Sequence, residues 1–360
     1  MKNYLASIFL LINILCLNVQ GANIKPLNII WSKYLYDTNY KYNYWSNGVS
    51  AIENTNEGGV VITGTGFKRS YITKLNKNGK IVWQKTFVYG ALVLTKTPDN
   101  GYIVGGGETT HNRSFIIKFD KNGNKIWSKY GSMPQSVGIM KVVSALTTTS
   151  TGDILIGVYN VSNYSIMKLD KNGNKIWSKN FVGNVVPKKI IITSKGNIIV
   201  VSNGYEDDES SSVIKLSNKG KKIWSRVVPN FSAYSCTITS DGGLVLLGDD
   251  SNNGYSQILI KLNKNGSEKW TKSYKNYESE TGIVRTSDGG FITSGFYIVK
   301  LDNKGNRIWV ADYGKLLKGD QPYYRVKITK TSDGNFVIGG QDYINDTGVS
   351  FILKFKSLSN

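Results

Sequence analysis

Three aspartates are the residues of this sequence best suited to catalysis. Asp249 and Asp250 follow one apolar run, and Asp342 follows another. A pair of carboxylates flanking a glycosidic bond can act as acid and base or as acid and nucleophile. The six arginines, which could hold an acidic sugar near such a pair, are scattered along the chain. A carbohydrate-active hydrolase or lyase that uses these carboxylates is therefore kept as the second hypothesis.

The remaining reactive residues do not form a metal site. His111, the single histidine, stands beside Arg113 without a second histidine or a cysteine near it, so neither a zinc site nor a histidine-based triad is indicated. The acidic run at 206–209 lacks the ligand spacing of a calcium loop. The segments DKNGN at 120–124 and 170–174 begin like such a loop, but no distal glutamate follows, and hairpin turns explain them. We expect no metal and no cofactor.

The N-terminus has the layout of an export signal. Lys2 precedes an apolar run from Tyr4 to Val19, and Gly21 offers a small residue at a cleavage site. The run is shorter than the roughly 20 residues that span a membrane. We expect residues 1–21 to be the signal peptide and 22–28 a short extension, in a protein exported to the periplasm, the cell surface or the medium.

Composition limits the partners. The chain carries 45 lysines and arginines against 25 acidic residues, a formal charge of +20. The lysines recur at regular intervals instead of forming one basic segment, and we expect no nucleic-acid partner. Removal of the signal leaves only Cys236, so no internal disulfide can form. We interpret Cys236 as a small buried apolar residue, because it lies in an alternating run.

The residues above are set within a repeat, in which a lysine is followed nine residues later by a tryptophan. The pairs are Lys74 and Trp83, Lys118 and Trp127, Lys168 and Trp177, Lys215 and Trp224, Lys261 and Trp270, and Lys300 and Trp309. A turn glycine also recurs seven times, at Gly58, Gly101, Gly152, Gly196, Gly242, Gly289 and Gly334. Short β-branched and aromatic runs bounded by Gly, Asn and Asp are typical of strands. Tryptophan spacings of 39 to 52 residues match one four-stranded blade per repeat, which predicts an all-β, seven-bladed propeller.

A seventh lysine–tryptophan pair is divided between the two ends of the chain, as Lys354 and Trp31. We therefore predict that the strand at 29–36 pairs with the strand at 350–356 and closes the ring. A cut before about residue 38 should then open the ring, whereas removal of 22–27 should have little effect. The single domain, 29–360, is expected to hold blades at about 48–87, 91–131, 137–181, 187–228, 233–275, 280–313 and 323–356, the last completed by 29–36.

The nine-residue spacing predicts a contact across the outer hairpin of each blade. With a four-residue turn, Phe119 should oppose Ile126 and Lys118 should oppose Trp127. The ammonium and its aliphatic stem would then lie over the indole in a cation–π contact. We expect the indole to be buried, so Trp127→Ala should cost about 3–5 kcal/mol as a large-to-small core substitution.

The repeat resembles those of known propeller groups. The segments TSDGGFI and IVKLDNKGNRIW, at 286–292 and 298–309, resemble the repeats of secreted bacterial β-propeller proteins. More remotely, KLDKNGNKIW is similar to the tryptophan-docking motif of quinoprotein dehydrogenases and of the propeller lipoprotein that helps assemble outer-membrane proteins. The quinoprotein dehydrogenases usually have eight blades, and many have adjacent cysteines beside the cofactor. No residue here matches their cofactor ligands, so the resemblance implies an architecture and no quinone cofactor.

Propeller topology sorts the predicted turns onto two faces. The first and third turns of each blade share one face, which also gathers many lysines. We interpret this face as a solvated rim, with peripheral association to an anionic surface as the functional alternative. The opposite face carries the variable loops, in which tyrosines are frequent and where binding residues are usually found. A notch is expected at blade six, between the loops near Tyr277 and Tyr343, because the second loop there is very short.

These observations predict a non-enzymatic, exported binding or scaffold propeller. Its ligand would be a glycan, an envelope polymer or a protein, and we expect a monomer. The candidate binding residues are Tyr42, Trp45, Tyr205, Asp249, Asp250, Tyr277, Tyr323, Tyr324, Asp342 and Tyr343.

Overall fold

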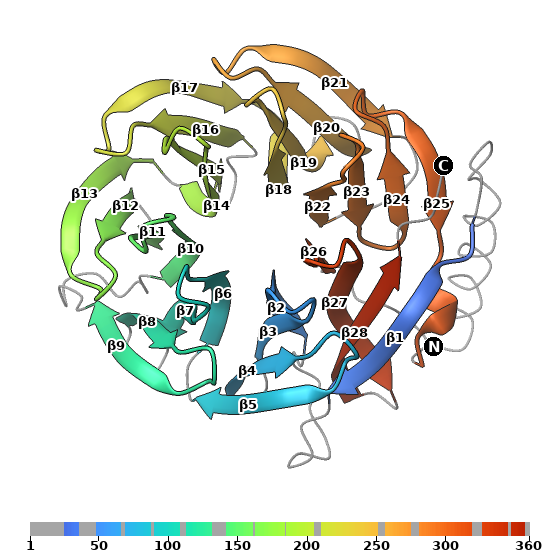
Figure 1. Ribbon diagram of the computed structural model, residues 1–360. Coiled ribbons are helices and arrows are strands. Elements are labelled where there is room, and N and C mark those ends of the chain that lie inside the picture. Colours follow the sequence, from blue (N-terminus) through green and yellow to red (C-terminus); the bar gives the residue numbers. More distant parts are fainter. Residues whose placement is uncertain are drawn as a thin grey trace, which may run out of the picture.

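In a computed structural model, seven four-stranded antiparallel sheets form a closed ring (Figure 1). The structure describes residues 25–35, 48–65, 69–87, 90–108, 113–131, 142–160, 163–183, 185–204, 210–250, 256–274, 281–318, 326–344 and 347–356. The predicted all-β, seven-bladed propeller is confirmed. Within the described residues, no helix is long and apolar enough to cross a membrane.

The first four blades each consist of four strands that are consecutive in the sequence, with the first strand innermost. Blade one contains β2 (Val49–Asn54), β3 (Val60–Thr65), β4 (Ser70–Leu75) and β5 (Ile81–Phe87). Blade two contains β6 (Gly90–Lys96), β7 (Tyr102–Glu108), β8 (Arg113–Phe119) and β9 (Lys125–Gly131). Blade three contains β10 (Val142–Thr148), β11 (Ile154–Asn160), β12 (Asn163–Leu169) and β13 (Lys175–Val182). Blade four contains β14 (Val185–Ile192), β15 (Ile198–Gly204), β16 (Ser211–Leu216) and β17 (Lys222–Val228).

Blades five and six keep this consecutive order, and blade seven departs from it. Blade five contains β18 (Phe231–Ile238), β19 (Leu244–Asp250), β20 (Ser256–Leu262) and β21 (Glu268–Tyr274). Blade six contains the short strands β22 (Gly282–Arg285), β23 (Phe291–Ser294), β24 (Ile298–Leu301) and β25 (Arg307–Ala311), followed by a 3₁₀ turn, η2 (Gly314–Leu316). Blade seven combines β26 (Lys327–Lys330), β27 (Phe336–Ile344) and β28 (Thr347–Lys356) with β1 (Asn28–Leu35) from the other end of the chain.

The ring closes as the sequence predicted. β1 pairs antiparallel with β28, from Asn28 opposite Lys356 to Leu35 opposite Ser350, and Trp31 opposes Lys354. Figure 1 shows the blue β1 lying along the outside of the red β28. The outermost strand of blade seven therefore comes from the N-terminal side of the chain.

The hydrophobic core lies between blades. Among the described residues, buried apolar side chains form seven clusters, and each cluster joins two neighbouring blades. For example, Val61 and Ile72 of blade one pack with Tyr102 and Phe115 of blade two. A single four-stranded blade exposes both faces, so only stacking around the ring removes these side chains from water.

The outer hairpins have the predicted lysine–tryptophan register but a different turn. All seven lysines oppose their tryptophans across the two outer strands. Phe119 opposes Lys125, however, and the register shifts between Phe119 and Lys118, which opposes Trp127. The expectation that Phe119 would oppose Ile126 was wrong. A bulge in the outer strand takes up one residue and restores the predicted register at the tryptophan.

Six of these seven lysines form ion pairs rather than the expected cation–π contacts. No lysine–tryptophan cation–π contact occurs among the described residues, whose cation–π contacts involve Arg113, Arg307 and Lys318 with tyrosines. Instead, six ammonium groups reach a carboxylate at or beside the first turn of their own blade. The pairs are Lys74–Glu57 (3.7 Å), Lys118–Asp99 (2.8 Å), Lys168–Asp153 (2.8 Å), Lys261–Asp241 (2.8 Å), Lys300–Asp288 (2.7 Å) and Lys354–Asp333 (2.6 Å).

The tryptophans contact the next blade. The indole N–H of Trp83 in blade one donates to the carbonyl of Lys121 in the third turn of blade two, at 3.1 Å. Gly123 in that turn has a φ of +82°, and a Cβ there would lie 2.7 Å from the Trp83 ring. Glycine therefore satisfies both the backbone conformation and the close approach of the indole. The same hydrogen bond recurs from Trp31, Trp177 and Trp224 to Lys77, Asn218 and Lys264.

Trp309 is the exception, because blade seven has no continuous outer hairpin. Its side chain is fully buried in a cluster with Phe355 and Phe336 of blade seven, and Leu27 packs against that cluster. Lys25 extends this contact, since its backbone N–H donates to the carbonyl of Val310 at 2.9 Å. The segment before β1 thus covers the tryptophan that has no turn to dock against.

Burial predicts unequal effects of removing the tryptophans. Trp309 is fully buried, whereas Trp127 is only partly buried, so the premise that Trp127 lies in the core was wrong. We expect Trp309→Ala to lower the free energy of unfolding by about 3–5 kcal/mol and Trp127→Ala by about half as much. Denaturant unfolding of both variants tests the difference. If both variants lost the same free energy of unfolding, the inferred difference in burial between Trp309 and Trp127 would be contradicted.

The contacts of Lys25 and Leu27 also change the expectation for truncation. Removal of residues 1–24 serves as the control. Removal through Leu27 should cost about 1–3 kcal/mol, because it uncovers Trp309 and removes one backbone hydrogen bond. Removal through Leu35 takes away all of β1 and should abolish cooperative unfolding. Thermal unfolding of the three truncated chains measures the series, and identical midpoints for the first two would refute the role of this segment.

Candidate functional site

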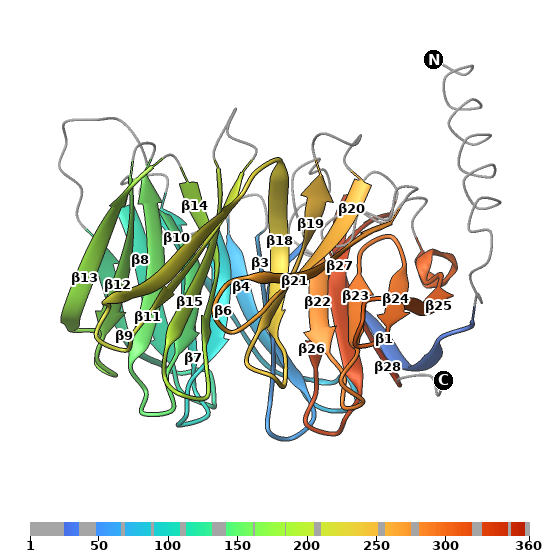
Figure 2. The same cartoon turned by 90° about the horizontal axis from the view of Figure 1, so that it is seen from above.

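The two faces of the ring differ in their turns. First turns such as 55–59 and third turns such as 76–80 lie together on one side, here called the regular face (Figure 2). The first turns are alike in all blades. In each one the backbone N–H of a threonine, such as Thr55, donates to the backbone carbonyl four residues later. The opposite side, here called the irregular face, carries the second turns and the connections between blades.

Most of the predicted binding residues lie outside the described part of the chain. These residues are Tyr42, Trp45, Tyr205, Tyr277, Tyr323 and Tyr324, and the same holds for His111 and for the acidic run at 206–209. Their predicted roles stay predictions. Four candidates can be placed: Asp249, Asp250, Asp342 and Tyr343.

The aspartates occupy two separate blades. Asp249 and Asp250 end β19 in blade five, whereas Asp342 lies in β27 of blade seven, with blade six between them. Asp249 is 6% exposed and accepts a hydrogen bond of 2.6 Å from the Tyr234 hydroxyl. Burial raises the pKa of Asp249, and the Tyr234 hydrogen bond opposes that effect. The structure does not bring the aspartates of the two blades together as a catalytic pair.

Asp342 has a structural position at the ring closure. It is fully buried and accepts a hydrogen bond of 3.0 Å from the Tyr34 hydroxyl of β1. Its other oxygen accepts the backbone N–H of Tyr343 at 2.8 Å. The Tyr34 hydroxyl in turn accepts the backbone N–H of Lys318 at 2.8 Å. Asp342 therefore helps to hold β1 and the segment after blade six in place.

The expected short second turn of blade six is present. Residues 295–297 join β23 to β24, and the N–H of Gly295 donates to the carbonyl of Tyr297 at 3.1 Å. Tyr313, which is fully buried, donates its hydroxyl proton to the carbonyl of Gly295. The segment after β25 thus packs against the shortened turn where the sequence suggested a notch.

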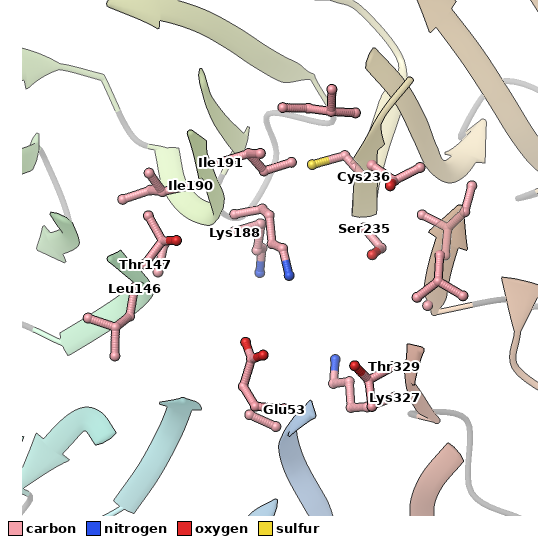
Figure 3. Close-up of a pocket in the computed structure, with 18 of the residues that line it drawn as sticks. Glu53, Leu146, Thr147, Lys188, Ile190, Ile191, Ser235, Cys236, Lys327 and Thr329 are labelled. Atoms are coloured by element: carbon pink, nitrogen blue, oxygen red, sulfur yellow. The ribbon is translucent and has the colours of Figure 1, made fainter. Parts of the chain in front are cut away.

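The centre of the ring holds a cavity of about 940 Å³, here called the central channel. The innermost strands of all seven blades line it: β2, β6, β10, β14, β18, β22 and β26. Figure 3 shows Glu53, Lys188 and Lys327 pointing into this space from three different blades. A cavity in which polar groups converge is the usual place for a ligand.

A bulge near the start of the innermost strand recurs in five blades. The extra residue is Ser50, Leu92, Ser144, Lys188 or Tyr234, and all five line the channel. Because β-bulges redirect side chains, these residues face the channel near the irregular face. Leu92 and Tyr234 are 44% and 38% exposed. The channel mouth therefore offers hydroxyls, an aromatic ring and a cation to a ligand.

The channel wall carries more positive than negative charge. Lys188, Lys189, Arg285 and Lys327 line it, and Glu53 is the only acidic residue among the described residues of the wall. Burial in the channel raises the pKa of Glu53, while Lys189 and Lys96 act in the opposite direction. A carboxyl group with a raised pKa is better suited than an unperturbed one to act as an acid or as a hydrogen-bond donor.

Two interpretations of individual residues are confirmed. Cys236 is buried and free, and burial raises the pKa of its thiol to about 12, so it is unreactive at neutral pH. Asp120 serves its own hairpin, because Oδ1 accepts the backbone N–H groups of Asn122 and Asn124, each at 2.8 Å. Asp170 does the same in blade three. No cluster of potential metal ligands occurs among the described residues.

The channel residues were not singled out from the sequence, although a signal for Glu53 exists. Every first turn begins with a threonine, such as Thr55 in blade one. Two residues before it, four blades have another threonine and two have an aliphatic residue, and Glu53 is the only charged residue at that position. Superposing the repeats would therefore have identified it.

Comparisons with known proteins identify the fold. No protein-family model matches the sequence, and no curated protein is significantly similar to it. A catalytically inactive variant of virginiamycin B lyase from Staphylococcus aureus, solved with quinupristin, has a TM-score of 0.61 at 15% identity, over 89% of this chain and 98% of the lyase. BBS1N, solved in complex with ARL6DN, has a TM-score of 0.61 at 9% identity, over 94% and 99% of the two chains.

A third similar structure is the Pan2 WD40 domain of Neurospora crassa, with a TM-score of 0.58 at 15% identity, over 86% of this chain and 92% of that domain. Likeness at such identities shows a β-propeller and nothing about activity. The relationship to quinoprotein dehydrogenases stays a prediction.

The raised pKa of Glu53 predicts a stabilising substitution. A carboxyl whose pKa is higher in the folded than in the unfolded state binds more protons when folded, so stability falls as pH rises between those two values. We expect Glu53→Gln to raise the melting temperature at about pH 7 and to change it little near pH 3.5, where both states are protonated.

Glu57→Gln is the matched control, with the opposite expected sign. Burial raises the pKa of Glu57, but hydrogen bonds from Thr55 and its own backbone and the charge of Lys74 lower it overall. This glutamate therefore stabilises the fold above its unfolded pKa, and the stabilisation is lost as pH falls. Glu57→Gln should lower the melting temperature at about pH 7. Destabilisation by Glu53→Gln at that pH would contradict the assignment.

Proposed function

We propose that this protein is an exported, non-enzymatic binding scaffold that holds a glycan, an envelope polymer or a protein on its irregular face. The observation that carries the proposal is the central channel, which is open to a ligand and lined by hydroxyls, lysines and Tyr234. The tyrosine-rich loops predicted from the sequence would surround this mouth. The excess of cations in the channel favours a ligand that carries carboxylate or other acidic groups.

Two further observations support binding rather than hydrolysis by the loop aspartates. Asp249 and Asp342 are buried, and each accepts a hydrogen bond from a tyrosine hydroxyl on another strand of its own blade. A carboxylate with such a role is poorly placed to meet a substrate. The propellers similar in structure include BBS1N in its complex with ARL6DN, so binding through this fold has a precedent.

A carbohydrate-active lyase or hydrolase is the second candidate, and Glu53 is the observation that favours it. Its raised pKa and its position in the channel suit a general acid. The fold is also shared with virginiamycin B lyase. In this case the catalytic carboxyl would be Glu53 and not the aspartates of blades five and seven.

A glycan array and analysis of any cleaved products distinguish the two candidates. We expect the purified protein to bind acidic polysaccharides without cleaving them. Lys189→Gln should weaken that binding at least about tenfold, because it removes an exposed cation from the channel wall. Lys85→Gln, at an exposed position on the outer strand of blade one, is the control and should leave the affinity unchanged.

Glu53→Gln provides the decisive comparison. Binding that survives this substitution, with no product formed by either protein, supports the scaffold. Cleavage by the wild-type protein that disappears in Glu53→Gln while binding persists would replace the proposal by the second candidate. If Lys189→Gln and Lys85→Gln lost the same amount of binding affinity, the ligand would be attracted by the overall positive charge and not by the channel.

A further inference from the structure

Blade four breaks the ion-pair pattern of the other six blades. In the third position of the first turn it has Lys195, where blades two, five, six and seven have aspartate. Blade three pairs its lysine with Asp153, which is two residues further on, but blade four has Asn197 at that place. Lys215, the lysine that opposes the tryptophan of this blade, therefore has no carboxylate partner in its first turn.

The hydrogen bonds of Lys215 confirm this difference. Its ammonium donates to the backbone carbonyl of Lys264, in the third turn of blade five, at 3.0 Å. Lys354 in blade seven makes the equivalent contact with the third turn of the next blade, through the carbonyl of Lys77 at 3.4 Å, but it also has Asp333 at 2.6 Å. Lys215 thus keeps the contact with the next blade and lacks the anion.

The turn threonine of blade four is bonded like those of blades one and three, where Thr55 and Thr149 accept the backbone N–H of Gly59 and Asp153, and unlike those of the other four blades. In blades two, five, six and seven the equivalent hydroxyl donates to the turn aspartate, as from Thr239 to Asp241 at 2.5 Å. In blade four, Thr193 Oγ1 accepts the backbone N–H of Asn197 at 3.0 Å. Among the described residues no carboxylate receives its proton, so this hydroxyl can donate to an added anion.

Electrostatics around Lys215 favour an anion. Burial lowers the pKa of Lys215, and the positive charges of Lys195 and Lys264 lower it further. Burial also lowers the pKa of Lys261 in blade five, but there the Asp241 carboxylate acts in the opposite direction. A lysine at the position of Lys264 also occurs in the third turns of blades one, two and three, so Lys195 is the departure: it places a second cation near Lys215 where the other six blades provide a carboxylate.

We propose that the regular face of blade four is a binding site for a phosphate or sulfate group, held by Lys195, Lys215 and Lys264 with Thr193. The oxyanion would take the place of the missing turn carboxylate. A doubly charged group with several acceptor oxygens can bridge Lys195 and Lys215 and also accept the threonine hydroxyl proton. The site lies on the face opposite the proposed ligand mouth, and the argument for it does not rest on the function proposed above, although Thr193 also lines the central channel.

Calorimetric titration with inorganic phosphate at low ionic strength tests the proposal. The wild-type protein should bind one phosphate saturably. Asn197→Asp should reduce the affinity at least about tenfold, because it gives Lys215 the carboxylate that Asp153 gives Lys168. Lys195→Asp should do the same by restoring the common turn sequence. Both variants should melt at a higher temperature than the wild-type protein without phosphate, since each one pairs Lys215.

Lys304→Asp is the matched control. It makes the same charge change as Lys195→Asp on the same face, at an exposed turn position where blades two and three have Asn122 and Asn172. Its phosphate affinity should stay within about twofold of the wild-type value. The proposal fails if the wild-type protein shows no saturable binding, if Lys304→Asp loses as much affinity as Lys195→Asp, or if Asn197→Asp binds phosphate unchanged.

Sedimentation with vesicles containing phosphatidic acid identifies the source of the phosphate group. Vesicle binding by the wild-type protein that is lost in Asn197→Asp and kept in Lys304→Asp supports the site and assigns it to a lipid headgroup. Saturable binding of inorganic phosphate without vesicle binding supports the site and assigns it to a soluble phosphate. Vesicle binding that all variants share, without phosphate binding, would overturn the proposal in favour of the diffuse charge of the regular face.

Discussion

The ring depends on the docking of each outer hairpin against its neighbour. A four-stranded blade cannot bury its two faces alone, and the apolar clusters of this protein all lie between blades. The tryptophan of one blade lies on the third turn of the next, where glycines such as Gly123 allow the contact. On the same outer strands, the lysine opposite the tryptophan reaches back to the first turn. Each repeat is thereby tied to the next blade and to its own inner strands.

Ring closure and blade six show what happens when this contact is interrupted. Blade seven takes its outer strand from the N-terminal side of the chain, so it has no third turn on which Trp309 could dock. Leu27 and Lys25 cover Trp309 instead, and Tyr313 packs on the shortened second turn. The buried Asp342 joins β1 to this region through Tyr34. Asp342, a candidate binding or catalytic residue from the sequence, thus stabilises the place where the two ends of the chain meet.

The two faces of the ring differ in how strictly they follow the repeat. Uniform turns and ion pairs make the regular face repetitive, whereas bulges in five inner strands direct different side chains into the channel mouth. Departures from the repeat are the informative positions on both faces. Glu53 replaces the usual threonine or aliphatic residue in the channel, and Lys195 replaces an aspartate in a turn. Each one places a charge where its equivalents have a different group. For Glu53, which lines the channel, burial makes that charge costly.

The sequence by itself determined the all-β class, the seven blades, the closure by β1 and the lysine–tryptophan register. It could do so because hairpin contacts are local and repeat at a fixed spacing, so chain order alone fixes them. It did not determine where the ammonium groups point, which tryptophan is buried, or that Asp249 and Asp342 serve buried hydrogen bonds. The channel and its bulges were also missed. Those features depend on which side chains meet across blades that lie far apart in the sequence, and only the closed ring decides that.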